Sequence, residues 1–352
     1  MNHAYIDLHL HLDGAITVPI ARELAALQHI TLPADDDRTL LSQLSVPSDC
    51  RSLNDFLKCF SLPLSLMQTR EGIREAVRLV QENIKRQGVI YAEIRFAPQL
   101  HCEQGLTQRE VIEAALDGLK ACDLPCNLIL CCMRGADNHR ANLETITLAK
   151  EYLILTAESS ASAGVAEPTN SAAPGDSALP RFGVAAIDLA GAESLFPTAD
   201  FADLFELASS LHIPFTIHAG EADGPDSVRR AVELGASRIG HGVRIAGDSE
   251  TMALVRDRGV TLELCPTSNR QTLAVEDMKL YPLKQFLEYG IKVTLNTDDM
   301  AICRTSMPEE LDYVKTEFEI SDAQEHAILL NAVDAAFADR KTKEMLKAQL
   351  AL

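Results

Sequence analysis

Residues 128–132, LILCC, and residues 184–190, VAAIDLA, are short runs made almost entirely of apolar side chains. A strand has this composition when helices cover both faces of its sheet, as they do in parallel α/β folds. The two runs belong to predicted strands at residues 126–133 and 182–190. Six similar runs predict further strands, at residues 5–12, 89–97, 214–218, 238–240, 260–265 and 292–296.

Segments with apolar side chains at helical spacing separate these strands, at residues 107–121, 140–155, 200–211, 226–234 and 249–258. Eight strands that alternate with helices predict an α/β fold of the (β/α)8 (TIM) barrel type. We expect one domain over residues 1–352, with extra helices at its C-terminal end. A doubly wound open sheet is the structural alternative.

Two insertions interrupt the alternation. Roughly 75 residues separate the first two strands, more than one connecting helix needs, and we expect a helical lid at about residues 30–85. Its apolar stripe, at the spacing of one helix face, comprises Leu53, Phe56, Leu57 and Phe60. The stripe fits either core packing or a lid, and an insertion after a barrel strand lies at the catalytic face. The second insertion, at residues 156–180, is rich in Ala, Ser, Pro and Gly and is expected to be flexible and dispensable for chemistry.

The composition limits the partners of the chain. With 352 residues, a net charge of −19 and 47% apolar residues, the chain is expected to fold and to bind neither nucleic acid nor anionic membranes. The nine cysteines form no CxxC pair, and no apolar run reaches about 18 residues. The first residues, MNHAYIDLHLHLDG, lack the regions of a secretory signal. We therefore expect a soluble cytoplasmic protein that binds a small molecule.

Side chains that bind metals or transfer protons gather where the predicted strands end. His9 and His11 end the first strand, and the alternation of side chains places both on one face. The fifth strand ends in His218, which Glu221 follows in HAGE. The sixth strand ends in His241 in IGHG, and the eighth ends in Asp298 and Asp299 in LNTDD. Barrel enzymes place their active sites at these strand ends. The other six histidines are expected to be surface or packing residues.

Three imidazoles and one carboxylate suit one Zn²⁺ per chain with a water in the remaining position; the candidate ligands are His9, His11, His218 and Asp298. Zinc lowers the pKa of such a water toward ~7. Fe²⁺ or Co²⁺ would suit the same ligands. No lysine occurs in the fourth-strand segment AAIDLAGAE, so a single metal ion is expected. Glu221 and His241 remain as acid or base groups, which favours hydrolytic attack on an electrophilic carbon.

The motifs HExxH, Walker A, GxSxG and GxGxxG are absent. The chain instead resembles the adenosine deaminase family of the amidohydrolase superfamily. The matching segments occur in family order: DLHLHLDGA (7–15), YAEIRFAP (91–98), CCMR (131–134), AIDLAG (186–191), HAGE (218–221), RIGHG (238–242), ELCPTSN (263–269) and LNTDD (295–299).

The resemblance implies a (β/α)8 barrel with one catalytic zinc on the four ligands above, which hydrolyses adenosine and 2′-deoxyadenosine in purine salvage. It implies that Glu221 protonates the purine N1 and that His241 orients and deprotonates the attacking water. The resemblance also implies that Asp299 positions the hydroxide and contacts the purine N7. On the substrate side, the implied contacts are His11, the Gly191 N–H at N3, Asp13 at the ribose 5′-hydroxyl, and the stripe as a hydrophobic gate.

Two departures bear on the substrate. Ala192 stands where the family commonly has Asp, and Gly135 where it often has His. Other 6-aminopurines remain alternatives. Adenine deaminases usually carry DHG where residues 240–242 of this chain are GHG. Asp13 is unfavourable for the phosphate of N6-methyl-AMP. Aminofutalosine remains a possible substrate. A catalytically inactive binding barrel is a distant alternative, although neither the zinc ligands nor Glu221 are lost. The sequence does not indicate an oligomeric state.

Overall fold

The computed structural model describes residues 4–154 and 182–350. Within these ranges the strands pair in parallel and form two four-stranded sheets, in the orders β1-β2-β3-β4 and β5-β6-β7-β8. The strands are β1 (Tyr5–His11), β2 (Val89–Phe96), β3 (Cys126–Met133), β4 (Val184–Ala190), β5 (Thr216–Ala219), β6 (Arg238–His241), β7 (Thr261–Leu264) and β8 (Lys292–Leu295). All predicted strands are present, with boundaries within two residues of those expected.

Two isolated bridges close the sheets into a barrel. Ile187 pairs with Phe215 between β4 and β5, and Leu10 pairs with Asp298 just beyond β8. At this second seam the His11 N–H donates to the Asp298 carbonyl and the Asp298 N–H donates to the His9 carbonyl, both at 2.8 Å. The predicted (β/α)8 barrel is therefore confirmed, and the open-sheet alternative is wrong. Candidate ligands from opposite ends of the sequence meet at the closing seam.

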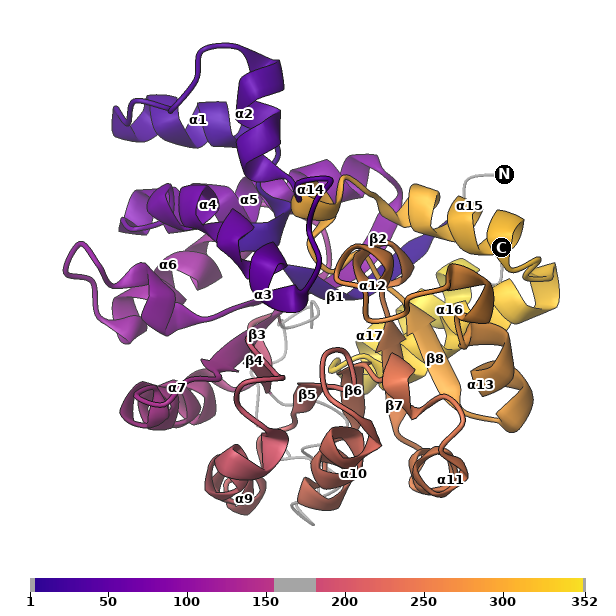
Figure 1. Ribbon diagram of the computed structural model, residues 1–352. Coiled ribbons are helices and arrows are strands. Elements are labelled where there is room, and N and C mark those ends of the chain that lie inside the picture. Colours follow the sequence, from indigo (N-terminus) through magenta and orange to yellow (C-terminus); the bar gives the residue numbers. More distant parts are fainter. Residues whose placement is uncertain (1–3, 155–181, 351–352) are drawn as a thin grey trace, which may run out of the picture.

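Helices surround the strands on all sides (Figure 1). The helices before β5 are α1 (Val18–Gln28), α2 (Asp37–Leu44), α3 (Leu53–Phe56), α4 (Ser61–Ser65), α5 (Arg70–Arg86), α6 (Gln108–Leu119), α7 (His139–Tyr152) and α9 (Ala202–Ser210). The later ones are α10 (Pro225–Leu234), α11 (Ser249–Asp257), α12 (Pro266–Gln271), α13 (Leu283–Tyr289), α14 (Met300–Cys303), α15 (Met307–Glu317), α16 (Asp322–Ala335) and α17 (Arg340–Leu350). None of these helices has the length and apolarity of a membrane span.

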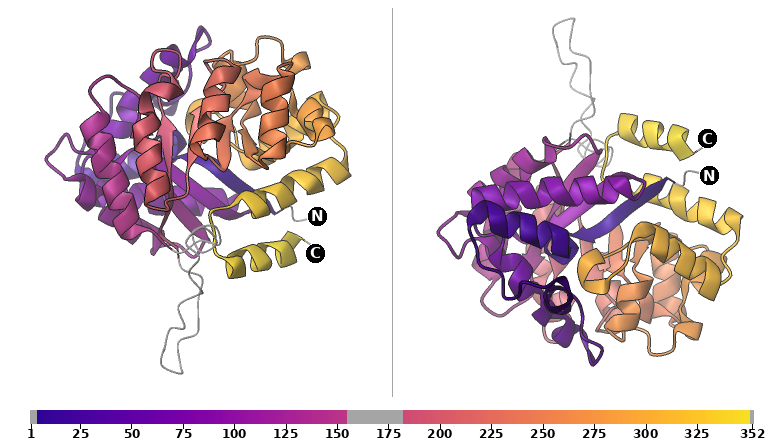
Figure 2. Two further views of the ribbon diagram at one scale, coloured as in Figure 1. Left: turned by 90° about the horizontal axis from the view of Figure 1, so that it is seen from below. Right: turned by 90° about the horizontal axis from the view of Figure 1, so that it is seen from above.

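The expected C-terminal helices are present as α15, α16 and α17. Helix α16 contacts both β8 and β1, so it covers the outside of the closing seam. Helix α17 packs on α16 and ends on the side of the molecule where β1 begins (Figure 2). Together these helices bury the apolar outer face of β1, including Ile6 and Leu8, with Val333 and Leu346.

Helix α5 shows how local sequence defines the surrounding ring. The Thr69 hydroxyl accepts a hydrogen bond from the Gly72 N–H and caps the first turn. The helix buries one stripe, which includes Ile73, Val77, Val80 and Ile84, and packs against β2, α1 and α6. Gly88 then takes a φ of 91°, a conformation that favours glycine, and turns the chain into β2.

The range predicted for the lid, residues 30–85, contains α2, α3, α4 and nearly all of α5, but its apolar stripe is not on one helix. Residues Leu53–Phe56 form α3, and residues Leu57–Phe60 form a 3₁₀ helix that leads into α4. Pro63 has no N–H to donate to the Cys59 carbonyl, and its ring crowds that carbonyl, which disfavours a continuous α-helix here. The prediction of a single helix was therefore wrong. The predicted flexible insertion at residues 156–180 lies outside the described residues.

Candidate active site and metal centre

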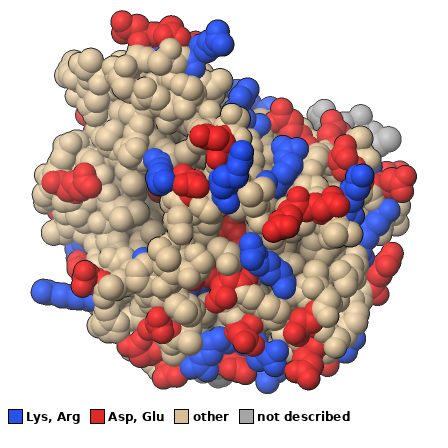
Figure 3. Space-filling model, in the orientation of Figure 1, with Lys and Arg blue, Asp and Glu red and all other residues tan. Residues whose placement is uncertain are grey.

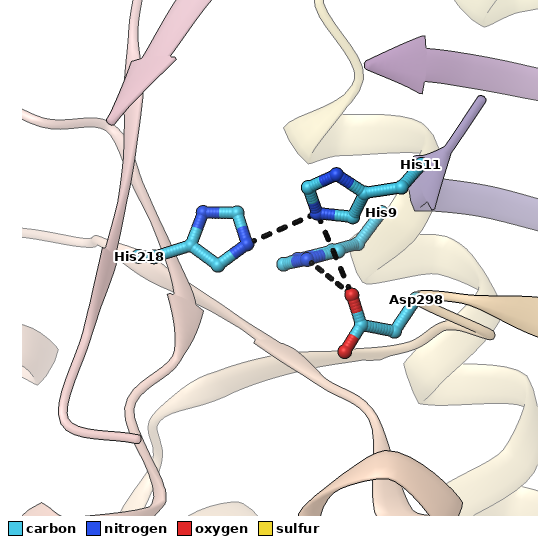
Figure 4. A group of neighbouring side chains, drawn as sticks. All are labelled: His9, His11, His218 and Asp298. Atoms are coloured by element: carbon cyan, nitrogen blue, oxygen red, sulfur yellow. Dashed lines mark hydrogen bonds and ion pairs between the residues drawn. The ribbon is translucent and has the colours of Figure 1, made fainter. Parts of the chain in front are cut away.

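Four candidate metal ligands converge at the carboxyl ends of β1, β5 and β8, and they are His9, His11, His218 and Asp298 (Figure 4). Nε2 of His11 lies 3.2 Å from Nε2 of His218. Oδ1 of Asp298 lies 3.1 Å from Nε2 of His9 and 3.5 Å from Nε2 of His11. Ligand atoms around a tetrahedral zinc are about 3.3 Å apart, so the set fits one ion. Nε2 of His9 is buried and makes no hydrogen bond, which is consistent with a ligand role.

Buried carboxylates hold two of these histidines from behind. Nδ1 of His9 lies 2.7 Å from Glu263, and Nδ1 of His218 lies 2.8 Å from Asp188. Arg95 joins the two carboxylates, at 3.1 Å from Asp188 and 2.8 Å from Glu263. Such partners fix the ring orientation and leave Nε2 free to bind a metal. The sequence prediction missed all three residues, although a charged residue inside an otherwise apolar strand is a usable signal.

The backbone is strained at two of the candidate residues. His241 has a φ of 64° and Asp298 a φ of 61°. Both values lie in the left-handed backbone region, which residues other than glycine rarely adopt. Strain of this kind clusters at functional sites. Two glycines make room beside the site. A Cβ on Gly14 would lie 1.8 Å from Oδ1 of Asp299, and a Cβ on Gly240 would lie 2.9 Å from the His9 ring.

Three further candidates have perturbed protonation. Burial, together with the charges of Asp298 and Glu193, raises the pKa of Glu221 to about 8. Burial holds the pKa of His241 well below its usual value, and its Nε2 lies 3.5 Å from Oε2 of Glu221. Burial and the charge of Asp298 hold the pKa of Asp299 well above its usual value. These shifts favour the protonated forms of Glu221 and Asp299 and the neutral form of His241.

Glu193 organises the turn that carries Glu221. Its carboxylate accepts backbone hydrogen bonds from Gly220, Glu221, Ala222 and Asp223, at 2.7, 3.0, 2.7 and 3.0 Å. Successive N–H groups that point at one anion form a rigid concave turn. Glu193 was not predicted, although it is adjacent to the Ala192 departure.

These groups line one cavity of about 210 Å³. Every predicted site residue except His9 lines it, and His9 lies beneath His11 and His218. The sequence prediction missed other lining residues, namely Leu64, Ala97, Leu100, Cys131, Met133, Ala190 and Ser268. No Lys or Arg is among the described residues that line the cavity, and neither are Ala192 and Gly135.

The charges of the surrounding face are unevenly distributed. Acidic and basic side chains are interspersed over its right-hand part, whereas much of the part over α1, α4 and α6 is uncharged (Figure 3).

Five of the six remaining histidines lie in the described ranges. His29, His139, His212 and His326 are exposed, and His101 is buried with a 2.9 Å hydrogen bond to the Met67 carbonyl. These five are surface or packing residues, as predicted.

A closed parallel (β/α)8 barrel with a metal-type ligand cluster at its strand ends defines the class of metal-dependent barrel enzymes. The chain belongs to the adenosine deaminase family, whose model matches residues 5–154 and 153–351. It is 43% identical to an adenosine deaminase of Haemophilus ducreyi over 353 residues, covering 99% of this chain and 96% of that one. It is 36% identical to an adenosine deaminase of Clostridium botulinum over 349 residues, covering 97% and 96%.

Solved structures share the fold at lower identity. An adenine deaminase from Arthrobacter aurescens superposes with a TM-score of 0.82 at 23% identity, covering 98% of this chain and 97% of that one. An N6-mAMP deaminase from Arabidopsis superposes with a TM-score of 0.79 at 22% identity, covering 98% and 97%. Because this fold is shared by deaminases of different purines, the fold does not determine the substrate.

Proposed function

We propose that this chain removes the 6-amino group of adenosine and 2′-deoxyadenosine by hydrolysis, with one bound Zn²⁺, and releases ammonia and the inosine product. The observation that carries the proposal is that Glu221, with its pKa raised to about 8, lines one cavity together with three of the candidate ligands and an uncharged apolar wall, while the fourth candidate ligand, His9, lies beneath His11 and His218. Relatives with 43% and 36% identity over nearly the whole chain are adenosine deaminases, which supports this choice.

The proposed roles follow from the protonation states. A divalent ion on His9, His11, His218 and Asp298 supplies activated water when it is bound. Adding the water oxygen to C6 disrupts the aromatic purine and drives negative charge onto N1. Glu221 retains its proton at neutral pH because it is buried beside two carboxylates, so it can donate this proton to N1. Burial and the charge of Asp298 raise the pKa of Asp299, and in its protonated form Asp299 can donate a hydrogen bond to N7.

His241 is proposed to orient the attacking water. Its Nε2 faces Glu221 at 3.5 Å and Oδ2 of Asp298 at 3.9 Å, so it borders the space between the acid and the ligand cluster. Outside this region, Gly191 lines the cavity, and its N–H is the proposed donor to the purine N3.

The lining favours a nucleoside over a nucleotide. A 5′-phosphate needs cationic or N–H donors, and no Lys or Arg lies among the described lining residues. Asp13, buried and with its pKa raised to about 6 by burial, suits a hydroxyl instead. The apolar gate of Leu53, Phe56, Leu57 and Phe60 would cover the uncharged ribose. These features disfavour N6-methyl-AMP as the substrate.

We also propose that the protein works in the cytoplasm. All nine cysteines are unpaired thiols, and six of them are buried. Free thiols persist in a reducing compartment.

The ultraviolet change on incubation with adenosine tests the function. We expect rapid conversion to inosine that a strong chelator abolishes and added Zn²⁺ restores. Adenine, N6-methyl-AMP and aminofutalosine are assayed in parallel. Each should be converted at least about 10²-fold less efficiently, because each either lacks a substrate group that the pocket residues would bind or adds one for which the pocket has no partner. Preferred conversion of any of them by zinc-loaded protein would overturn the proposal.

A further inference from the structure

The buried ring of His241 faces different groups with its two nitrogens. Nε2 faces the cavity, near Glu221 and Asp298. Nδ1 faces away from the cavity and lies 3.0 Å from the side-chain nitrogen of Asn269, in α12. In a neutral imidazole one nitrogen donates and the other accepts, so the group opposite Nδ1 determines what Nε2 offers to the substrate.

The amide of Asn269 is held in turn by Tyr281. The Tyr281 hydroxyl donates to Oδ1 of Asn269 at 3.0 Å, which directs the amide NH₂ toward His241. Rotating the amide by 180° would remove the acceptor of this buried hydroxyl, which has no other acceptor among the described residues. An unsatisfied buried hydroxyl costs about 1–3 kcal/mol. Tyr281 is itself fixed by stacking on Phe318, with ring centroids 5.2 Å apart and planes at 13°.

This chain of contacts specifies the form of the ring. An N–H of Asn269 can meet Nδ1 of His241 only if Nδ1 carries a lone pair. The proton of the ring must then be on Nε2, which faces the cavity. The imidazolium form is disfavoured by the same contact, because two N–H groups would oppose each other at 3.0 Å.

We propose that Asn269 and Tyr281 are positioning residues that hold His241 in the tautomer with its proton on Nε2. His241 then orients the attacking oxygen by donating a hydrogen bond to it. A ring in this form takes no proton at Nε2, so the orienting part of the role implied by the family resemblance applies and the deprotonating part does not. This role rests on the proposed function, but the form of the ring can be measured without substrate.

The test is the long-range ¹H–¹⁵N spectrum of the zinc-loaded protein, with the His241 signals assigned from a His241→Gln sample. We expect wild-type His241 to be protonated on Nε2 alone. Tyr281→Phe keeps the stacked ring but frees the amide, so both tautomers should appear and kcat for adenosine should fall by about tenfold, with KM within about twofold. Asn269→Asp places an acceptor at Nδ1, so the proton should move there and kcat should fall by about a hundredfold.

Tyr313→Phe is the matched control. Tyr313 also packs on Phe318, with ring centroids 5.7 Å apart, but its hydroxyl forms a hydrogen bond with Arg270 and not with Asn269. It should leave both the spectrum and kcat as in wild type. Protonation of wild-type His241 on Nδ1, or an unchanged ring form in both Tyr281→Phe and Asn269→Asp, would overturn the proposal. If the protein fails to convert adenosine, the proposed function fails while the spectra still decide the form of the ring.

Discussion

We call the polar residues at the strand ends the floor of the pocket, and the apolar residues Leu53, Phe56, Leu57 and Phe60 its roof. In the floor, three histidines are each held by a second buried polar group. In the roof, the side chains are held by apolar packing alone. His9, His218 and His241 contact Glu263, Asp188 and Asn269 respectively. The roof residue Phe56 packs with Ile302 and Cys303, and Leu53, Leu57 and Phe60 are only half-buried. Directional contacts fix a geometry to tenths of an ångström, and apolar contacts allow movement. We therefore expect floor changes to affect chemistry or metal, and roof changes to affect substrate binding.

The largest expected effect is from Glu221→Gln in the floor. The amide keeps the shape of the side chain but cannot deliver a proton, so kcat for adenosine should fall by about 10³-fold. Zinc content, measured by elemental analysis, should stay at the wild-type level because Glu221 is not in the ligand cluster. Full activity of the metal-replete variant would contradict the assignment of the acid.

Asp188→Asn should have the next largest effect. It removes the charge behind His218 and beside Arg95, and loss of such an outer partner costs about 10–100-fold in metal affinity. Zinc Kd is measured by competition with a chelator, and thermal unfolding is followed in parallel. Asp226→Asn, at a fully solvent-exposed carboxylate, is the control and should bind zinc as wild type does. Wild-type zinc affinity in Asp188→Asn would show that the floor tolerates the loss of its outer contacts.

The pH dependence of kcat/KM tests the floor without changing its shape. Glu221 is proposed to act in its protonated form, and its pKa is raised to about 8, so this form is present below that pH and is lost above it. We expect kcat/KM to be level near neutral pH and to fall about tenfold per pH unit above pH 8. This alkaline limb should be absent from the residual activity of Glu221→Gln. A limb that persists in that variant would belong to another group.

The smallest expected effect is from Phe60→Ala in the roof. Because Phe60 lines the cavity and is half-buried, its truncation should raise KM for adenosine by about tenfold or less and change kcat little. Lys58→Ala, in the same 3₁₀ helix and exposed, should match wild type. A hundredfold loss of kcat in Phe60→Ala would remove the distinction between floor and roof.

Most of the floor was predictable because its residues follow strands in a fixed pattern. His9 and His11 alternate on β1, and His218, His241 and Asp298 each end or follow a strand, so the closure of a parallel barrel brings them together. The roof was less predictable. Its residues were identified, but the break between α3 and the 3₁₀ helix depends on Pro63 and on packing that spacing alone does not specify.

The outer partners of the floor could not be predicted from local sequence. Glu263 and His9 are 254 positions apart, and Asn269 meets His241 only because α12 begins directly after β7. A charged residue in a strand is compatible with many partners, and the fold selects one of them. Glu193, which holds the turn at Glu221, is a comparable case.

The sequence by itself determined the alternation of strands and helices, the identity of the candidate ligands and acid, and membership of the family. These depend on residue type and on spacing along the chain. The tertiary structure alone decided which nitrogen of each histidine faces the cavity, how far Glu221 is shielded from water, and which carboxylates support the ligand set. These depend on distances between distant segments, because hydrogen bonds and pKa values respond to neighbours in space and not in sequence.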